Sequence, residues 1–237
     1  ADSHLAAAVE AAGRAGDGER KASLQVMRAD MLISLKQLPL ASQLLDEAER
    51  ADTGKLRPFV QHYRGKILWK TNRFEQALGP LTESFDEFKR LGRKHDAAVV
   101  AISLGTCFYR LGQSDKARAA YEEALRLAPE DPQLAVGHLG ALHQAQRRVD
   151  LAAESFRKAA AEAAGVDEEY RLMWLSNLAT SLISENQWDE AERVNRDVLE
   201  REERLEGSLG LDHSRVNEAS IAAGRGDLPR AAQLLEQ

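Results

Sequence analysis

Small residues recur along the chain at nearly even spacing, and this periodicity constrains the fold more than any other feature of the sequence. Each of them opens an apolar pattern with helical spacing. A period of roughly 20 to 50 residues indicates stacked units that are each too small to bury their own apolar face. Successive members lie 36, 40, 35, 39 and 40 residues apart, at Ala41, Ala77, Ala117, Ala152, Ala191 and Ala231.

The most regular unit, residues 104–132, carries Gly105 inside a helical apolar pattern. A glycine inside a helix costs about 1 kcal/mol relative to alanine, so the missing side chain must be required there. We expect each unit to be an antiparallel helix pair in which Gly105 of the first helix meets Ala117 of the second, where the two backbones come closest. Tyr121 is expected to fill the space beside this crossing.

Composition indicates an all-α protein. Hydrophobic residues make up 43% of the chain, but only 5% are aromatic, and alanine and leucine supply most of the apolar content. This balance favours helices over strands. No window approaches the roughly 18 apolar residues of a membrane span, so we expect no membrane insertion. The formal charge of −6 has both signs interspersed, which argues against nucleic acid as a partner of this segment.

The sequence lacks the residue patterns of an enzyme or a metal protein. There is no nucleophile elbow, phosphate-binding loop or zinc-protease motif, and His138 and His143 are five residues apart, a spacing that does not put two ligands on one helix face. The single Cys107 has no disulfide partner within the chain. We therefore expect no catalytic residues, no metal and no cofactor, and a cytoplasmic location.

Spacing and residue types together resemble the tetratricopeptide repeat, with its pattern W-x2-L-G-x2-Y, then A-x3-F, then P over about 34 residues. The longer intervals are similar to those of kinesin light chains and of bacterial regulators of the maltose-activator type. The resemblance implies an all-α, right-handed superhelical solenoid of antiparallel helix pairs. Residues 1–21 are expected to form a helix of an incomplete repeat and a turn, before repeats at 22–55, 58–91, 98–131, 133–166, 172–205 and a truncated 212–237.

In this family, fixed positions of each first helix line a concave peptide-binding groove. Two features stand out among the matching positions: a basic, aromatic-flanked patch of Lys66, Lys70 and Arg110, and asparagines where related repeats hold a peptide backbone. Simple solvation of a helix face explains the basic residues equally well. The groove residues implied by the resemblance are His62, Tyr63, Lys66, Trp69, Lys70, Thr106, Tyr109, Arg110, His138, Asn177, Thr180 and Asn217.

The resemblance implies a non-catalytic protein–protein interaction module that binds a peptide or partner helix, with an acidic ligand favoured by the basic patch. The alternative is an effector-sensing regulatory region of a larger bacterial signalling or transcription-regulating protein. Because the last repeat is incomplete, the chain is expected to be a segment of a longer protein and to self-associate through that repeat.

Overall fold

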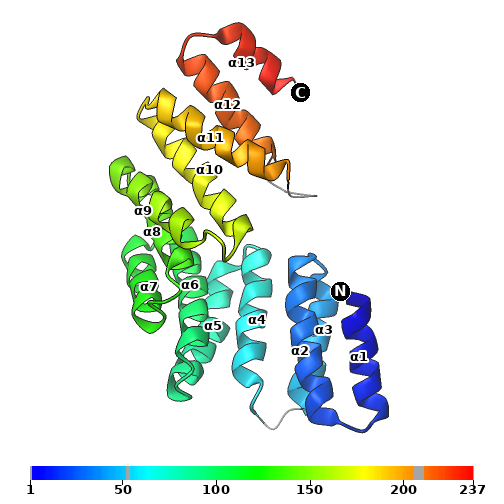
Figure 1. Ribbon diagram of the computed structural model, residues 1–237. Coiled ribbons are helices and arrows are strands. Elements are labelled where there is room, and N and C mark those ends of the chain that lie inside the picture. Colours follow the sequence, from blue (N-terminus) through cyan, green and yellow to red (C-terminus); the bar gives the residue numbers. More distant parts are fainter. Residues whose placement is uncertain (1, 52–53, 205–210, 237) are drawn as a thin grey trace. The chain divides into compact units, whose positions relative to one another are not determined.

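The computed structural model describes residues 2–51, 54–204 and 211–236, which form thirteen α-helices and no strand (Figure 1). The predicted all-α fold of repeated helix pairs is confirmed. The helices are α1 (Asp2–Arg14), α2 (Gly18–Ser34), α3 (Leu38–Ala51), α4 (Arg57–Lys70), α5 (Phe74–Arg90), α6 (Lys94–Arg110), α7 (Ser114–Leu127), α8 (Gln133–Ala145), α9 (Val149–Glu162), α10 (Glu168–Ser184), α11 (Trp188–Glu202), α12 (Leu211–Gly224) and α13 (Leu228–Leu235).

The chain divides into two compact units, Ala1–Ala128 and Pro129–Gln237. Unit 1 contains α1 and the pairs α2–α3, α4–α5 and α6–α7, and unit 2 contains the pairs α8–α9, α10–α11 and α12–α13. Within each unit the first helices of successive pairs also touch, α2 with α4 and α4 with α6 in unit 1, and α8 with α10 and α10 with α12 in unit 2. One side of each unit is therefore built from first helices.

Several first helices begin about one helical turn before the expected repeat starts. Helices α2, α6 and α10 start at Gly18, Lys94 and Glu168, where the repeats were expected to begin at 22, 98 and 172. Side-chain caps explain two of these earlier starts. The Asp17 carboxylate accepts a hydrogen bond of 3.0 Å from the Arg20 backbone N–H, and that of Asp167 accepts one of 3.0 Å from Tyr170.

The contact that requires glycine at position 105 differs from the expected one. A Cβ built on Gly105 would lie 2.5 Å from Tyr121 Cε1, and its three nearest atoms all belong to the Tyr121 ring. Ala117 is fully buried, but it is the tyrosine ring that occupies the space of the missing side chain. The same relationship joins Gly65 to Leu81 and Gly140 to Phe156, so each of these pairs interlocks a glycine with a large residue.

Candidate functional site

The first helices of unit 1 bring two candidate side chains, Lys66 and Tyr63, to the Asp30 carboxylate. Lys66 Nζ on α4 lies 2.6 Å from Asp30 Oδ1 on α2, and it also lies 5.2 Å from the centre of the Tyr63 ring. Burial, then the negative charge of Asp30 and the hydrogen bond to it, raise the pKa of Tyr63 well above its usual range. Because Lys66 and Asp30 form an ion pair at 2.6 Å, the Asp30 carboxylate offsets most of the positive charge of Lys66.

His62 connects α4 to α6 beside this cluster. Its Nε2 atom lies 3.4 Å from Ser103 Oγ, and its ring stacks on Tyr63 with 5.2 Å between ring centres. The side chain is buried, with only 7% of the residue exposed. Burial, helped by the nearby Lys66 charge, lowers the pKa of His62 to about 4, so the ring is neutral at neutral pH.

Lys70 and Arg110 are the exposed cations of the predicted patch. Lys70 Nζ lies 5.1 Å from the centre of the Trp69 ring, and Arg110 Cζ lies 4.8 Å from that of Phe74. Because Phe74 follows α4 after a short turn, both cations lie near the α4–α5 turn. Neither has an ion-pair partner among the residues that the structure describes. They remain able to attract an anionic ligand.

The hydroxyl of Thr106 already makes hydrogen bonds within the protein, and Tyr109 is only partly exposed. Thr106 Oγ1 donates to the Ile102 carbonyl at 2.9 Å and accepts from the Tyr121 hydroxyl at 3.4 Å, so it faces the second helix of its own pair. Tyr109 is half-buried on α6. Phe74 was not among the sequence candidates because it opens a second helix; its position just beyond Lys70 was the available signal.

The remaining four candidates lie in unit 2. The His138 ring meets Trp174 edge-on at 5.5 Å, and burial lowers its pKa to about 4. Asn217 is 4% exposed, and its Nδ2 donates to the Ser176 carbonyl at 3.4 Å, while Thr180 Oγ1 lies 3.3 Å from Asn217 Oδ1. Asn217 thus holds α12 to α10, whereas Asn177 is half-buried and its side chain has no hydrogen-bond partner among the described residues. The twelve candidates form two sets, one in each unit.

Three other features of the described residues bear on metal binding, nucleophilic chemistry and membrane insertion. In the described ranges no group of three or more His, Cys, Asp or Glu side chains is arranged to hold a metal ion. The Cys107 thiol is fully buried, and burial raises its pKa to about 11, which opposes formation of a nucleophilic thiolate. No helix among the described residues is long and apolar enough to cross a membrane.

The stacked pairs, with first helices aligned on one side of each unit, define an α-helical repeat protein. The chain belongs to the tetratricopeptide repeat family, whose models match residues 58–130, 102–167 and 171–215. Proteins of this family are typically non-catalytic, and the match places the chain among protein-interaction or regulatory repeat modules. No curated protein matches its sequence.

Three solved structures illustrate the likeness in fold. A putative kinesin light chain repeat protein from Podosopora anserina is 18% identical, with a TM-score of 0.63, and 78% of this chain and 92% of that one are covered. The Rap conjugation gene regulator of plasmid pLS20, in complex with the Phr* peptide, is 15% identical at a TM-score of 0.69, covering 94% and 74%. A STAND signal-transduction ATPase with a tetratricopeptide repeat sensor, from Pyrococcus horikoshii, is 16% identical at a TM-score of 0.70, covering 93% and 36%.

Proposed function

We propose that this chain is a non-catalytic interaction module that binds a peptide or a partner helix on the first-helix side of unit 1. The observation that carries this proposal is the position of Lys70 and Arg110, exposed and without described ion-pair partners, beside aromatic rings at the α4–α5 turn. Cations held on aromatic faces are only partly hydrated and are well placed to meet a carboxylate or phosphate. The likeness to a Rap regulator that is solved with a peptide supports the same class of ligand.

The ligand is an acidic or phosphate-bearing segment. Its anionic groups meet Lys70 and Arg110, and its apolar side chains pack on Tyr63, Trp69 and Tyr109. Lys66 contributes little attraction because Asp30 already neutralises it at 2.6 Å. In unit 2, the Asn217 amide already donates to the Ser176 carbonyl and is not available to a ligand.

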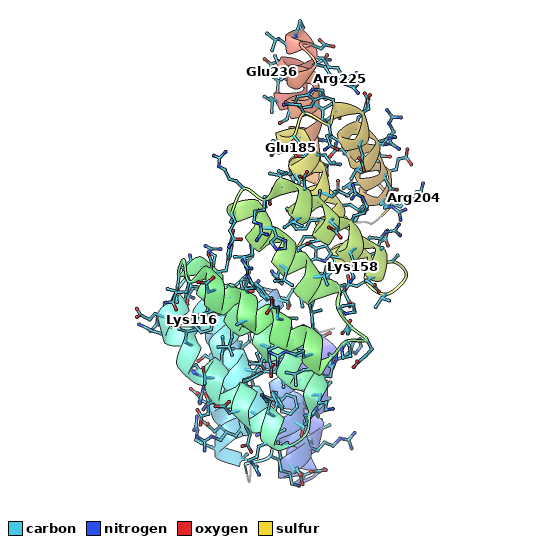
Figure 2. The ribbon with its side chains drawn as sticks, turned by 90° about the vertical axis from the view of Figure 1, so that its left-hand side faces the viewer. Lys116, Lys158, Glu185, Arg204, Arg225 and Glu236 are labelled. Atoms are coloured by element: carbon cyan, nitrogen blue, oxygen red, sulfur yellow. The ribbon has the colours of Figure 1, made fainter. Side chains whose placement is uncertain are left out.

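A peptide panel tests this proposal. Synthetic peptides of equal length with acidic, phosphoserine-containing, neutral or basic sequences would be titrated against the protein, with fluorescence anisotropy as the readout. The double variant Lys70→Glu/Arg110→Glu should lose binding of the acidic and phosphorylated peptides. The matched control, Arg126→Glu/Lys158→Glu, makes the same charge change at exposed positions of the second helices α7 and α9 (Figure 2 labels Lys158).

Binding that survives the first double variant would place the ligand elsewhere. Equal losses in both double variants would show a general charge effect instead of a site. If no peptide class binds, the first-helix side of unit 1 is not a peptide site.

The second candidate function is an effector-sensing regulatory region of a larger signalling protein. The fold likeness to a STAND protein with a repeat sensor favours it, although this chain spans only 36% of that protein. The discriminating observation is the sequence that flanks this chain in its gene. A nucleotide-binding or DNA-binding neighbour would favour the sensor, and a free-standing repeat array would favour the interaction module.

A further inference from the structure

Successive helix pairs meet at a joint, where the second helix of one pair packs against the first helix of the next. In the α5–α6 and α9–α10 joints, three equivalent positions are apolar and almost completely buried. Two of them lie four and eleven positions after the recurring alanine of the second helix, and the third lies in the first half of the following helix. The residues are Leu81, Phe88 and Val100 at the α5–α6 joint, and Phe156, Ala163 and Trp174 at the α9–α10 joint.

The α11–α12 joint carries polar residues at all three of these positions. They are Asn195, Glu202 and Ser214, and they are buried just as deeply, with 2%, 4% and 0% exposed. Amide, carboxyl and hydroxyl groups cost free energy when they leave water, unless hydrogen bonds within the protein replace those to water. The core of this joint is therefore weaker than the apolar cores of the other two.

Hydrogen bonding within this polar cluster is incomplete. Asn195 Nδ2 donates to the Ser214 carbonyl at 2.9 Å. Asn195 Oδ1, Glu202 Oε2 and Ser214 Oγ are buried and have no hydrogen-bond partner in the part of the chain that the structure describes. Each buried polar atom left unpaired adds to the cost of closing the joint. An opening that admits water to the cluster would remove this cost.

Glu202 is the titratable group of the cluster. Burial raises the pKa of Glu202 above its ordinary value of 4.5, while the Ser214 hydroxyl and the charge of His213, an exposed residue of α12, act in the opposite direction. The closed joint therefore favours the neutral carboxyl.

The cations near this end of α11 are bound to other carboxylates. Arg201 lies 2.7 Å from Asp197 on its own helix and 2.7 Å from Glu168 on α10. Arg171 of α10 lies 3.7 Å from the same Glu168. Among the described residues, none forms an ion pair with Glu202, so its ionised form is buried without a counter-charge.

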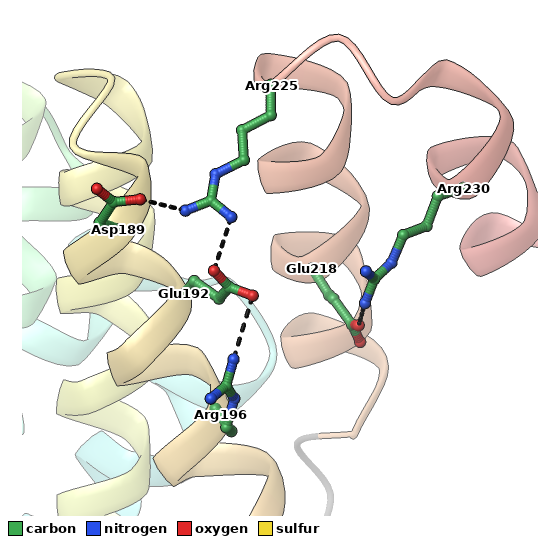
Figure 3. A network of polar contacts seen from close by, with 6 residues as sticks. All are labelled: Asp189, Glu192, Arg196, Glu218, Arg225 and Arg230. Atoms are coloured by element: carbon green, nitrogen blue, oxygen red, sulfur yellow. Dashed lines mark hydrogen bonds and ion pairs between the residues drawn. The ribbon is translucent and has the colours of Figure 1, made fainter.

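The opposite end of the joint is held more firmly (Figure 3). Helices α11 and α12 run antiparallel, so the start of α11 lies beside the end of α12. A Cβ on Gly224 would lie 2.3 Å from the Trp188 ring, which shows how closely this end is packed. Arg225, directly after α12, pairs with Glu192 at 2.7 Å and also with Asp189. The polar cluster and the tight contact thus lie towards opposite ends of one helix–helix contact.

We propose that the α11–α12 joint is a proton-controlled hinge, which opens at the Glu202 end about the Trp188–Gly224 contact when Glu202 is ionised and closes when Glu202 is protonated. Protonation removes the buried charge and adds an O–H donor beside acceptors that lack one. The hinge lies within unit 2 and is independent of the peptide-binding side proposed for unit 1.

The direction of the pH effect follows from proton linkage. The closed joint binds the proton more tightly than the open one, so closing is favoured below pH 4.5 and this contribution is lost as the pH rises through the raised pKa of Glu202. The opening equilibrium constant increases about tenfold for each unit by which closing raises the pKa.

Backbone hydrogen exchange between pH 4.5 and 7.5, corrected for the intrinsic pH dependence of exchange, measures this opening. In the wild type, α12 should lose protection as the pH rises, more in its first half than near Gly224, while α9 should not follow this change. Glu202→Gln removes the charge and should keep the low-pH protection at every pH. Glu200→Gln is the matched control, because Glu200 is exposed on the same helix, and it should behave like the wild type.

Two further variants separate the hinge from other causes. His213→Gln should retain the pH dependence, which excludes histidine titration as its source. The triple variant Asn195→Leu/Glu202→Ala/Ser214→Val introduces residue types that the other joints carry at these positions, as in Leu81, Ala163 and Val100. It should protect α12 at every pH at least as well as Glu202→Gln does.

The hinge is ruled out if protection of α12 in the wild type does not change with pH, or if the change persists in Glu202→Gln. It is also ruled out if Glu200→Gln or His213→Gln abolishes the change, or if the triple variant protects α12 less than the wild type at pH 7.5. Peptide binding by unit 1 is measured separately with the anisotropy panel, so the two proposals can fail independently.

Discussion

Lys66 Nζ on α4 and Asp30 Oδ1 on α2 lie 2.6 Å apart, and this pair changes what the basic patch can do. Since Asp30 neutralises Lys66, Lys66→Met should slow association with an acidic peptide much less than Lys70→Met does. Charges at the rim of a site act mainly on the association rate. Stopped-flow association at two salt concentrations measures both effects. A larger loss for Lys66→Met would mean that the ligand displaces Asp30.

His62 should make the stability of unit 1 sensitive to acid. Its folded pKa is about 4, below the ordinary value of 6.5, because of burial and then Lys66. The unfolded chain therefore binds a proton that the folded chain refuses, and stability is lost as pH falls from 6.5 toward 4, by up to about 1.4 kcal/mol per pH unit. Above pH 6.5 this contribution is constant.

The measurement is urea unfolding between pH 7 and 4.5 for the wild type and His62→Gln. The free-energy difference between the two should shrink as the pH falls. His4→Gln, at an exposed position on α1, is the control. A difference that stays constant with pH would show that His62 has the same pKa in the folded and the unfolded protein.

Gly105→Val should destabilise the protein by about 1–3 kcal/mol, because the side chain would enter the space of the Tyr121 ring. Valine has a higher helix propensity than glycine, which alone would stabilise the helix. The sign of the change in unfolding free energy therefore shows whether propensity or overpacking is the larger effect. Gly13→Ala on α1 is the control, since its Cβ would meet only Lys21, at 3.7 Å. A thermal midpoint for Gly105→Val that is unchanged or raised would contradict the packing described for this pair.

Helix pairing was predictable from the sequence because its signals are local. The alanine at position 117 and the glycine at position 105 lie within one repeat, and their spacing alone indicates two helices that cross closely. The identity of the contact was not predictable. Tyr121 was expected beside the crossing, but whether its ring occupies the space of the missing Gly105 side chain depends on a side-chain rotamer, which spacing does not specify.

The candidate site was less predictable because its properties depend on residues of different repeats. Lys66 occupies a groove position in the pattern, but it forms an ion pair with Asp30, 36 positions earlier. Asn217 likewise matches a ligand-binding position, yet its amide is used by the Ser176 carbonyl of the preceding pair. Asn195 stands at the fifth A-x3-F position in place of an aromatic or leucine, but the sequence did not show that this polar side chain is buried, with 2% exposed.

Self-association through α13 is a further expectation. Leu228 and Leu235 are 66% and 65% exposed, while Ala231 is buried against the rest of the pair. Burying such apolar surface between two copies is favourable. Leu228→Lys/Leu235→Lys should lower the association measured by analytical ultracentrifugation at high protein concentration, whereas Leu91→Lys, at an isolated exposed leucine after α5, should not. A monomeric wild type would rule this contact out.

Asn217 and Asn177 should differ in their effect on the stability of unit 2. Asn217→Ala removes a hydrogen bond between α12 and α10, at a cost of about 0.5–1.5 kcal/mol, while the Ser176 carbonyl keeps the Thr180 hydroxyl as a donor at 3.1 Å. The cost should appear in denaturant unfolding and as faster amide hydrogen exchange in α12. Asn177→Ala, at a half-buried position of α10, should leave both unchanged. An unfolding free energy that falls for Asn177→Ala and stays the same for Asn217→Ala would contradict the role given to the Asn217 amide.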